Sequence, residues 1–128
     1  MESITVTALL DEARRGLRRS TPHEAWAEID DGAILIDIRC DSERAETGVV
    51  PGAIPIARSV LEWRCDPSSG HSDDRVARPD ERVLLLCAHG YSSSLAAASL
   101  RRLGFAQVGD VVGGMEAWLD AELPVLPG

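Results

Sequence analysis

The amino-acid sequence predicts an α/β domain with a mainly parallel sheet flanked by helices, and two features of the chain support this fold class. Short apolar runs of strand length alternate with segments of helical periodicity, which is typical of parallel strands joined by crossover helices. The runs at 33–39 and 83–87 are almost continuously apolar, as expected of strands buried on both faces. The 128 residues correspond to one ordinary domain.

The chain begins with a predicted helix and a predicted edge strand. Leu9, Leu10 and Ala13 recur at helical spacing among polar residues, so we expect a short helix over 6–15. The residues that follow, 17–19, are expected to form a brief edge strand.

A second helix is predicted from its own start signals. Thr21 is a suitable N-cap, Pro22 suits the first helical position, and Glu24 closes a capping box three residues after the cap. We expect this helix to run to about Ile29, where the sequence Asp30-Asp31-Gly32 ends it.

Two charged residues lie at the carboxyl end of the strand predicted over 33–39. Asp37 and Arg39 occupy the edge of the sheet where open α/β folds form their ligand-binding crevices. This strand should lie near the one at 83–87. We interpret the two residues mainly as a structural ion pair that ties loops together, with a role in ligand binding as the alternative.

The remaining segments continue the same alternation. We expect a helical turn at 41–47, a short strand at 53–56, a short helix at 58–64, a strand at 105–112 and a short helix at 115–119. The segment 65–82 shows no periodicity and predicts a long surface loop in a position to border the site.

A cysteine stands at the end of the most apolar strand. The strand over 83–87 ends on Cys87, a short loop containing Gly90 follows, and an alanine-rich helical segment runs on to Gly104. Backbone N–H groups of the loop and the amino end of the helix can face the sulfur and lower the pKa of the thiol from its usual value of about 8.5. Cys87 is therefore the candidate nucleophile, with a buried structural cysteine as the alternative.

Composition and charge exclude several classes of function. The formal net charge of −8 disfavours binding to nucleic acid, which usually starts from a basic surface. No apolar run approaches the roughly 20 residues that a membrane-spanning helix needs, and the first residues carry no signal for export, so we expect a cytoplasmic protein without a membrane partner.

The cysteines are few and widely spaced. Cys40, Cys65 and Cys87 contain no C-x-x-C pair, so neither a disulfide framework nor a zinc site is indicated. We expect free thiols in a reducing compartment and neither a metal nor another cofactor.

Four motifs in a fixed order resemble those of the rhodanese-domain sulfurtransferases. They are the loop Cys87-Ala88-His89-Gly90-Tyr91-Ser92, the element Asp37-Ile38-Arg39, the segment Gly48-Val49-Val50-Pro51-Gly52-Ala53 and the ending Gly113-Gly114-Met115-Glu116-Ala117-Trp118. The resemblance covers the chain from about Thr21 to its end and implies a three-layer rhodanese-like domain. We therefore divide the chain into a helical extension, residues 1–20, and the domain, residues 21–128.

The resemblance also implies an activity. Members of this family catalyse a ping-pong reaction. By analogy, we expect the Cys87 thiolate to attack the outer sulfur of a donor such as thiosulfate, become a persulfide, and pass the sulfur to cyanide or a thiol. The residues expected to bind substrate are those of the loop and the first helical turn: Ala88, His89, Gly90, Tyr91, Ser92 and Ser93. Oligomeric state has no signal in the sequence.

The loop departs from the usual family pattern at its last position. Many members carry arginine where this chain has Ser92, although others similarly have a loop of the Cys-x-His-Gly-x-Ser type. The hydroxyls of Ser92 and Ser93 can donate to a sulfonate, more weakly than a charged group would. Arg58 and Arg64 are candidates for binding the anion, and solvated arginines on a short helix are the alternative.

Two further loop residues have open roles at this point. Histidine is the side chain that can change its charge near neutral pH, so His89 suits a hydrogen bond to a donor oxygen or the movement of a proton, with a solvent-facing histidine as the alternative. Tyr91 is expected to form a wall of the pocket.

Two other functions compete with sulfur transfer. Phosphatases and arsenate reductases of related fold use a longer Cys-x5-Arg loop that surrounds and neutralises a phosphoryl group, and here the corresponding residue is Ser93. A non-catalytic rhodanese-like binding or regulatory module is the second alternative, because the loop lacks its arginine.

Overall fold

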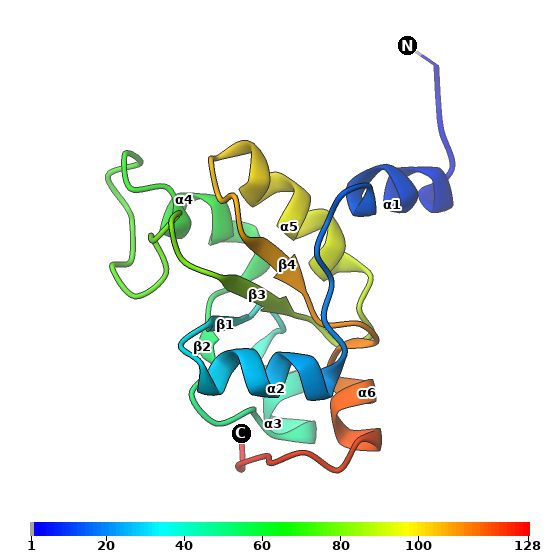
Figure 1. The fold of residues 1–128 in the computed structure, drawn as a ribbon, viewed down its shortest axis with the longest axis vertical. Helices are drawn as coiled ribbons and strands as arrows, with labels where there is room; N and C mark the ends of the chain where they lie inside the picture. Colours follow the sequence, from blue (N-terminus) through cyan, green and yellow to red (C-terminus); the bar gives the residue numbers. More distant parts are fainter. Residues whose placement is uncertain (1) are drawn as a thin grey trace.

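A parallel four-stranded sheet forms the centre of residues 2–128, the part of the chain that the computed structural model describes (Figure 1). Met1 lies outside the described residues, so the structure describes the predicted extension, residues 1–20, from Glu2 onward. The strands are β1 (Ile34–Asp37), β2 (Ile54–Pro55), β3 (Val83–Leu86) and β4 (Val108–Asp110), in the order β2-β1-β3-β4.

The strand register brings three chain segments to one edge of the sheet. Asp37 of β1 lies opposite Leu86 of β3, and Asp110 of β4 lies opposite Leu85. Because all pairs are parallel, the carboxyl ends of the strands meet at this edge. Cys87 follows Leu86 directly and therefore lies here, as predicted.

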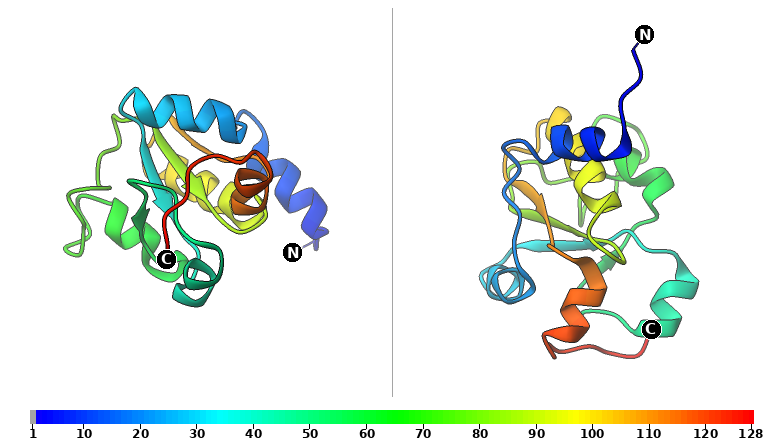
Figure 2. Two further views of the ribbon diagram at one scale, coloured as in Figure 1. Left: turned by 90° about the horizontal axis from the view of Figure 1, so that it is seen from below. Right: turned by 90° about the vertical axis from the view of Figure 1, so that its right-hand side faces the viewer.

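Helices enclose the sheet. They are α1 (Val6–Arg14), α2 (Pro22–Asp30), α3 (Asp41–Thr47), α4 (Leu61–Cys65), α5 (Ser92–Arg102) and α6 (Gly114–Asp120), and the 3-10 turn η1 (Arg58–Val60) leads into α4. Figure 2 shows α1 beside α5. Within the described part of the chain no helix is long and apolar enough to span a bilayer.

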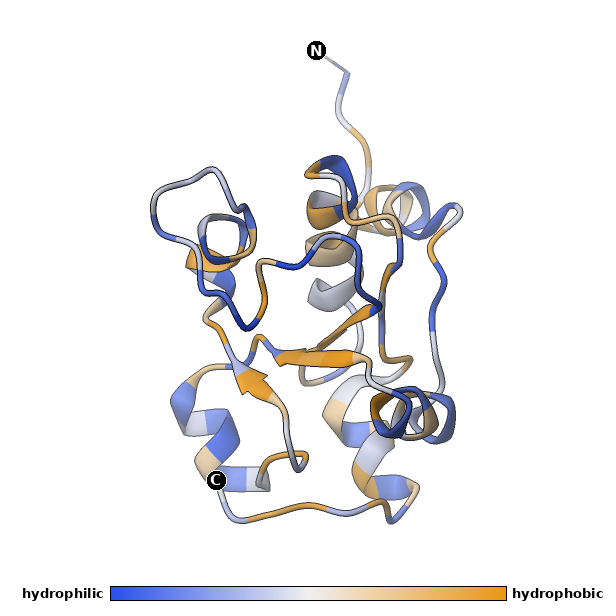
Figure 3. Ribbon diagram, turned by 60° about the vertical axis from the view of Figure 1, so that its left-hand side comes forward, coloured by the Kyte–Doolittle hydropathy of each residue, from blue (hydrophilic) through white to orange (hydrophobic). Residues whose placement is uncertain are grey.

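Alternate residues of β3 face two separate hydrophobic clusters. Val83 and Leu85 pack with residues of α4 and α5, whereas Leu84 and Leu86 pack with residues of α2 and α6. Figure 3 shows largely hydrophobic strands between helices with mixed surfaces. The predicted three-layer α/β architecture is thus confirmed.

Local signals determine where α2 begins. Thr21 Oγ1 accepts a hydrogen bond from the Glu24 N–H at 3.2 Å, and the Glu24 carboxylate accepts one from the Thr21 N–H at 2.8 Å. This is the predicted capping box, and Pro22 occupies the first turn as expected.

One predicted strand is absent and another is shorter than expected. Residues 17–19 form no strand, because the Arg18 carbonyl accepts from the Arg82 guanidinium and pairing with the sheet begins only at Ser20, as a single bridge to Val111. The strand predicted over 105–112 is limited to β4, because the Phe105 N–H instead caps the Leu100 carbonyl at the end of α5.

The long loop over 66–82 is present but does not border the cysteine. It leads into the amino end of β3, whereas Cys87 follows the carboxyl end of the same strand. None of its residues lines the cavity beside Cys87 described below. The expectation that this loop borders the site was wrong, since a strand length separates the two.

Candidate active site around Cys87

Cys87 begins a tight loop between β3 and α5. The loop runs over 88–91 and α5 starts at Ser92, so strand, loop and helix lie where the sequence predicts them. The backbone N–H of Gly90 donates a hydrogen bond to Cys87 Sγ at 3.1 Å. Cys87 is only 5% exposed, which leaves one small face of the residue open to a substrate.

The pKa of the Cys87 thiol is lowered from its ordinary value. Burial is the largest single influence and raises the pKa, because a thiolate loses hydration inside the protein. Hydrogen bonds from the Ser93 and Ser92 hydroxyls and from the Ser93 and Gly90 backbone N–H groups lower the pKa and together outweigh burial. The sulfur is therefore biased toward the nucleophilic thiolate.

The Gly113-Gly114 turn and the start of α6 lie against the outer side of the Cys87 loop and bind two carbonyl groups there. The Met115 N–H donates to the Cys87 carbonyl at 2.8 Å, and the Glu116 N–H donates to the Ala88 carbonyl at 3.1 Å. A Cβ atom on Gly114 would collide with the Cys87 carbonyl oxygen, so only glycine allows this approach. With these carbonyls engaged from outside, N–H groups of the loop are free to face the sulfur.

A buried carboxylate, Asp110 at the end of β4, organises the first turn of α5. Its Oδ2 accepts hydrogen bonds from Ser93 Oγ at 2.7 Å and from Ser94 Oγ at 2.8 Å. Because a hydroxyl has one proton, the Ser93 hydroxyl serves either Asp110 or the Cys87 sulfur at a given moment. The distance of 2.7 Å between Ser93 Oγ and Asp110 Oδ2 favours donation to Asp110. The Ser92 hydroxyl and the backbone N–H groups are therefore the more constant donors to the sulfur.

This arrangement changes the expected role of Ser93. We expected its hydroxyl to donate to a sulfonate, but the side chain is buried and directed at Asp110. A buried carboxylate holds a hydroxyl proton more strongly than a passing ligand can. Ser92 is exposed and lines the cavity, so it is the serine that can meet a substrate.

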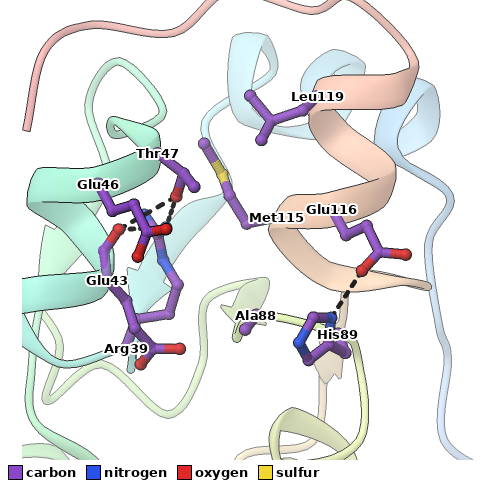
Figure 4. A pocket seen from close by; sticks show the side chains of 9 residues that line it. All are labelled: Arg39, Glu43, Glu46, Thr47, Ala88, His89, Met115, Glu116 and Leu119. Atoms are coloured by element: carbon purple, nitrogen blue, oxygen red, sulfur yellow. Dashed lines mark hydrogen bonds and ion pairs between the residues drawn. The ribbon is translucent and has the colours of Figure 1, made fainter.

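Two adjoining cavities open beside the sulfur. The first, which we name the Cys87 cavity, has about 220 Å³ and is lined by Ile38, Arg39, Glu43, Cys87, Ala88, His89, Tyr91 and Ser92. The second, the outer cavity, has about 310 Å³ and is lined by Arg39, Glu43, Glu46, Thr47, Ala88, His89, Met115, Glu116 and Leu119 (Figure 4). The carboxylates of α3 and α6 therefore line the cavities that lead to the sulfur.

Asp37 and Arg39 form a buried ion pair at this edge of the sheet. Their side chains are each 1% exposed and approach within 2.8 Å. The Arg39 guanidinium also donates to Thr47 Oγ1 at 2.7 Å (Figure 4) and to the Gly48 carbonyl at 2.7 Å, which ties β1 to the carboxyl end of α3. With its donors engaged, Arg39 is placed as a structural residue in the wall of both cavities.

His89 and Tyr91 flank the opening. The His89 side chain is 62% exposed, and its Nδ1 lies 2.9 Å from Glu116 Oε2 (Figure 4). Tyr91 is 63% exposed, lines the Cys87 cavity, and has the Arg14 guanidinium carbon 6.0 Å from its ring centre. Both side chains border the cavity. Within residues 2–128 neither of them forms a hydrogen bond to the Cys87 sulfur.

The structure does not bring Arg58 or Arg64 to the cysteine. Arg58 pairs at 2.8 Å with Glu62, four residues further on, and Arg64 donates at 3.0 Å to the His71 carbonyl. Neither lines the Cys87 cavity or the outer cavity. Each guanidinium takes an acceptor close to it in the chain, so their suggested role in anion binding is not supported.

Several residues around the loop were not anticipated from the sequence: Arg14, Arg19, Glu43, Ser94, Asp110 and Glu116. Asp110 had a detectable signal, because a lone carboxylate inside the apolar run 105–112 must find partners when it is buried. The two arginines had none, since they lie some seventy residues before the loop that they contact.

The other two thiols differ from Cys87. Burial, with the nearby carboxylates of Glu62 and Asp73, raises the pKa of the Cys65 thiol to about 12, so this thiol stays protonated. Cys40 is exposed at the start of α3. Among the described residues no three His, Cys, Asp or Glu side chains are grouped as a metal site would require.

Comparison with known proteins agrees with this geometry. The family model of the rhodanese-like domain matches residues 21–121. The thiosulfate sulfurtransferase GlpE of Haemophilus influenzae (strain PittEE) is 33% identical over 106 residues, which cover 82% of this chain and 90% of the relative.

Two solved structures share the fold over nearly the whole chain. A protein of unknown function from Rhodopseudomonas palustris CGA009, described as a possible tyrosine phosphatase, superimposes with a TM-score of 0.89 at 30% identity and covers 98% of this chain and 97% of its own. The polysulfide-sulfur transferase homodimer of Wolinella succinogenes has a TM-score of 0.75 at 26% identity and covers 94% and 85%, respectively.

Proposed function

This chain belongs to the rhodanese-like domain family, and on that premise we propose that it is a rhodanese-type sulfurtransferase that carries a sulfane sulfur as a persulfide on Cys87. The observation that carries the proposal is the Gly90 N–H directed at the Cys87 sulfur in a loop whose carbonyls are held outside. Several N–H groups around one sulfur stabilise both a thiolate and a persulfide anion. The relatives named thiosulfate sulfurtransferase make thiosulfate the first donor to test.

The first half-reaction conserves atoms and charge. The Cys87 thiolate attacks the outer sulfur of thiosulfate, the new bond joins Sγ to that sulfur, and the S–S bond of the donor breaks with its electron pair leaving on sulfite. In the second half-reaction cyanide, or a thiolate, attacks the terminal sulfur of the persulfide. The products are thiocyanate, or a new persulfide, and the regenerated Cys87 thiolate.

Donor recognition in this site rests on neutral groups. The Arg39 guanidinium in the cavity wall is engaged with Asp37, Thr47 and the Gly48 carbonyl. The Ser92 hydroxyl, loop N–H groups and His89 remain to receive the sulfonate oxygens. We also propose a reducing, cytoplasmic setting, because all three cysteines are free thiols.

Intact-mass measurement tests the proposal directly. The protein is incubated with thiosulfate, its mass is recorded, and cyanide is then added. We expect a gain of one sulfur atom that cyanide removes, in the wild type and in Cys40→Ser but not in Cys87→Ser. Failure to take up sulfur from thiosulfate, mercaptopyruvate and a small-molecule persulfide would sink the proposal and favour the non-catalytic binding module.

Phosphatase activity fits the site less well, although the structural relative from R. palustris is described as a possible tyrosine phosphatase. At the position where a Cys-x5-Arg loop has its arginine, this chain has Ser93, whose hydroxyl is directed at the buried Asp110 carboxylate. Without that arginine the loop has no fixed positive charge to surround and neutralise a phosphoryl group during its transfer. We therefore expect no hydrolysis of p-nitrophenyl phosphate under conditions in which Cys87 takes up sulfur.

A further inference from the structure

Two arginines from the chain before the family domain reach the back of the cysteine loop. Arg14, at the end of α1, donates through Nη2 to the Gly90 carbonyl oxygen at 2.8 Å. Arg19 donates through its own Nη2 to the same oxygen at 3.1 Å. The family model begins at residue 21, so neither arginine lies in the matched domain.

The same two arginines also hold the first turn of α5. Arg14 Nε donates to Ser94 Oγ at 3.0 Å, and Ser94 in turn donates to Asp110. Arg19 contacts both carboxylate oxygens of Asp110, at 2.8 and 3.3 Å. The arginines, the serine, the carboxylate and the Gly90 carbonyl therefore form one connected network beneath the loop.

The segment that carries these arginines is docked on α5. Arg101 of α5 donates to the carbonyls of Ala13 and Arg15, each at 3.2 Å, at the end of α1. The Ala13 side chain is buried, and Leu17 packs against the hydrophobic cluster that contains Cys87. These contacts limit the positions that the two guanidinium groups can adopt.

We propose that Arg14 and Arg19 are positioning residues of the Cys87 loop, through which the N-terminal segment prepares the sulfur site for catalysis. The proposal rests on the proposed role of Cys87 as the nucleophile. Neither arginine lines the Cys87 cavity, so both act from behind, through the Gly90 carbonyl and Asp110.

Peptide geometry explains how the contact is transmitted. The Gly90 carbonyl and the Tyr91 N–H belong to one trans peptide, in which the two groups point in opposite directions. Holding the carbonyl toward the arginines directs the Tyr91 N–H away from them. Glycine permits a wide range of backbone rotations, so without these donors the peptide is free to turn its carbonyl toward the sulfur.

Arg19 has a second effect, which is electrostatic. Asp110 is fully buried, and its hydroxyl partner Ser93 also contacts the Cys87 sulfur. A buried carboxylate close to a thiol raises the pKa of the thiol, because the two negative charges repel. The Arg19 guanidinium offsets the charge of Asp110 and so preserves the thiolate.

The test measures the pH dependence of Cys87 alkylation by iodoacetamide, followed by peptide mass spectrometry. The variants are Arg14→Gln and the pair Arg19→Gln with Asp110→Asn, which leaves no uncompensated buried charge. Arg15→Gln is the matched control, because Arg15 lies on the same segment with an exposed side chain. The other ionisable groups of the Cys87 cavity, Arg39, Glu43, His89 and Tyr91, are the same in every variant.

We expect the alkylation midpoint of Cys87 to move to higher pH in Arg14→Gln and to stay at the wild-type value in Arg15→Gln. In the paired variant it should rise less than in Arg14→Gln, because Arg19 and the Asp110 charge that it offsets are lost together and only the hydrogen bond to the Gly90 carbonyl is missing. The rate constant for sulfur loading from thiosulfate should fall about tenfold in Arg14→Gln, which corresponds to the loss of one charge-assisted hydrogen bond. Thermal unfolding verifies that each variant is folded at the assay temperature.

An Arg14→Gln protein that is folded and has the same alkylation midpoint as Arg15→Gln would overturn the positioning role. A wild-type protein that takes up no sulfur would count against the proposed function instead. In that case the alkylation midpoints still decide whether the arginines prepare the thiolate.

Discussion

The Gly90 backbone N–H donates to the Cys87 sulfur at 3.1 Å, and the Gly90 carbonyl accepts from Arg14 at 2.8 Å. One residue thus connects the sulfur on the inner side of the loop with a guanidinium on its outer side. Gly90 has φ +83°, a left-handed conformation, and a Cβ atom there would lie 2.6 Å from the Gly113 nitrogen. Both the conformation and the space require glycine.

Gly90→Ala should therefore lose sulfur transfer and destabilise the domain. The left-handed conformation alone costs about 1–2 kcal/mol in an alanine, and the contact with Gly113 adds to that cost. The matched control is Gly104→Ala, because Gly104 has φ +95° with no atom within 4 Å of the added Cβ. Denaturant unfolding and sulfur uptake are measured for both. Equal loss of sulfur uptake in the two variants would show that the contact with Gly113 has no role.

The three thiols should separate by their rate of alkylation. The pKa of Cys87 is lowered, whereas the pKa of Cys65 is raised to about 12 by burial and nearby carboxylates. A thiol reacts as its thiolate, so the alkylation rate of Cys87 should rise and level off at a lower pH than that of an ordinary thiol. Cys65 should remain unreactive in the native protein over the same range.

Ser92→Ala provides the corresponding variant, because it removes a hydrogen bond that lowers the pKa of Cys87. Its alkylation midpoint should move to higher pH. Alkylation of Cys87 at the pH expected of an ordinary thiol, in the wild type, would contradict an activated sulfur.

The buried pair of Asp37 and Arg39 should contribute strongly to stability. Removing one partner leaves a buried charge without compensation, so Arg39→Ala should lower the free energy of unfolding by about 3–5 kcal/mol. Arg75→Ala is the control, because the Arg75 side chain is 62% exposed where it pairs with Asp73 in the long loop, so the urea midpoint of this variant should hardly change. If Arg39→Ala lowers the free energy of unfolding only slightly, water must hydrate the Asp37 carboxylate in place of the guanidinium.

The carboxylates around the outer cavity should oppose an anionic donor. Glu46 lines this cavity and has an exposed side chain, so Glu46→Gln should lower the KM for thiosulfate by about twofold through reduced repulsion. Asp31→Asn, at the opposite edge of the sheet, should leave KM unchanged. Added salt should reduce the difference between Glu46→Gln and the wild type, since screening weakens exposed charges. A KM that is the same in Glu46→Gln and Asp31→Asn would exclude an effect of the carboxylates that line the outer cavity.

Local signals account for the parts of the fold that were predictable. The capping box of Thr21 and Glu24 placed the start of α2, and the continuous apolar run at 83–87 identified a central strand that Cys87 directly follows. Such features depend on residues a few positions apart, so they can be recognised in the sequence. The short pairing at Ser20 and the early end of β4 were not recognisable, because tertiary hydrogen bonds replaced the local strand pattern.

The sequence by itself determined the candidate nucleophile and the surrounding strand, loop and helix, because Cys87, Gly90 and the apolar run before them are contiguous in the chain. Only the tertiary structure decided which arginines form hydrogen bonds to the loop. Arg58 and Arg64 found acceptors near them in the chain, whereas Arg14 and Arg19 reach Gly90 across more than seventy residues, since α1 packs on α5. A guanidinium binds the acceptors that the folded chain brings within its reach, and spacing along the sequence does not contain that information.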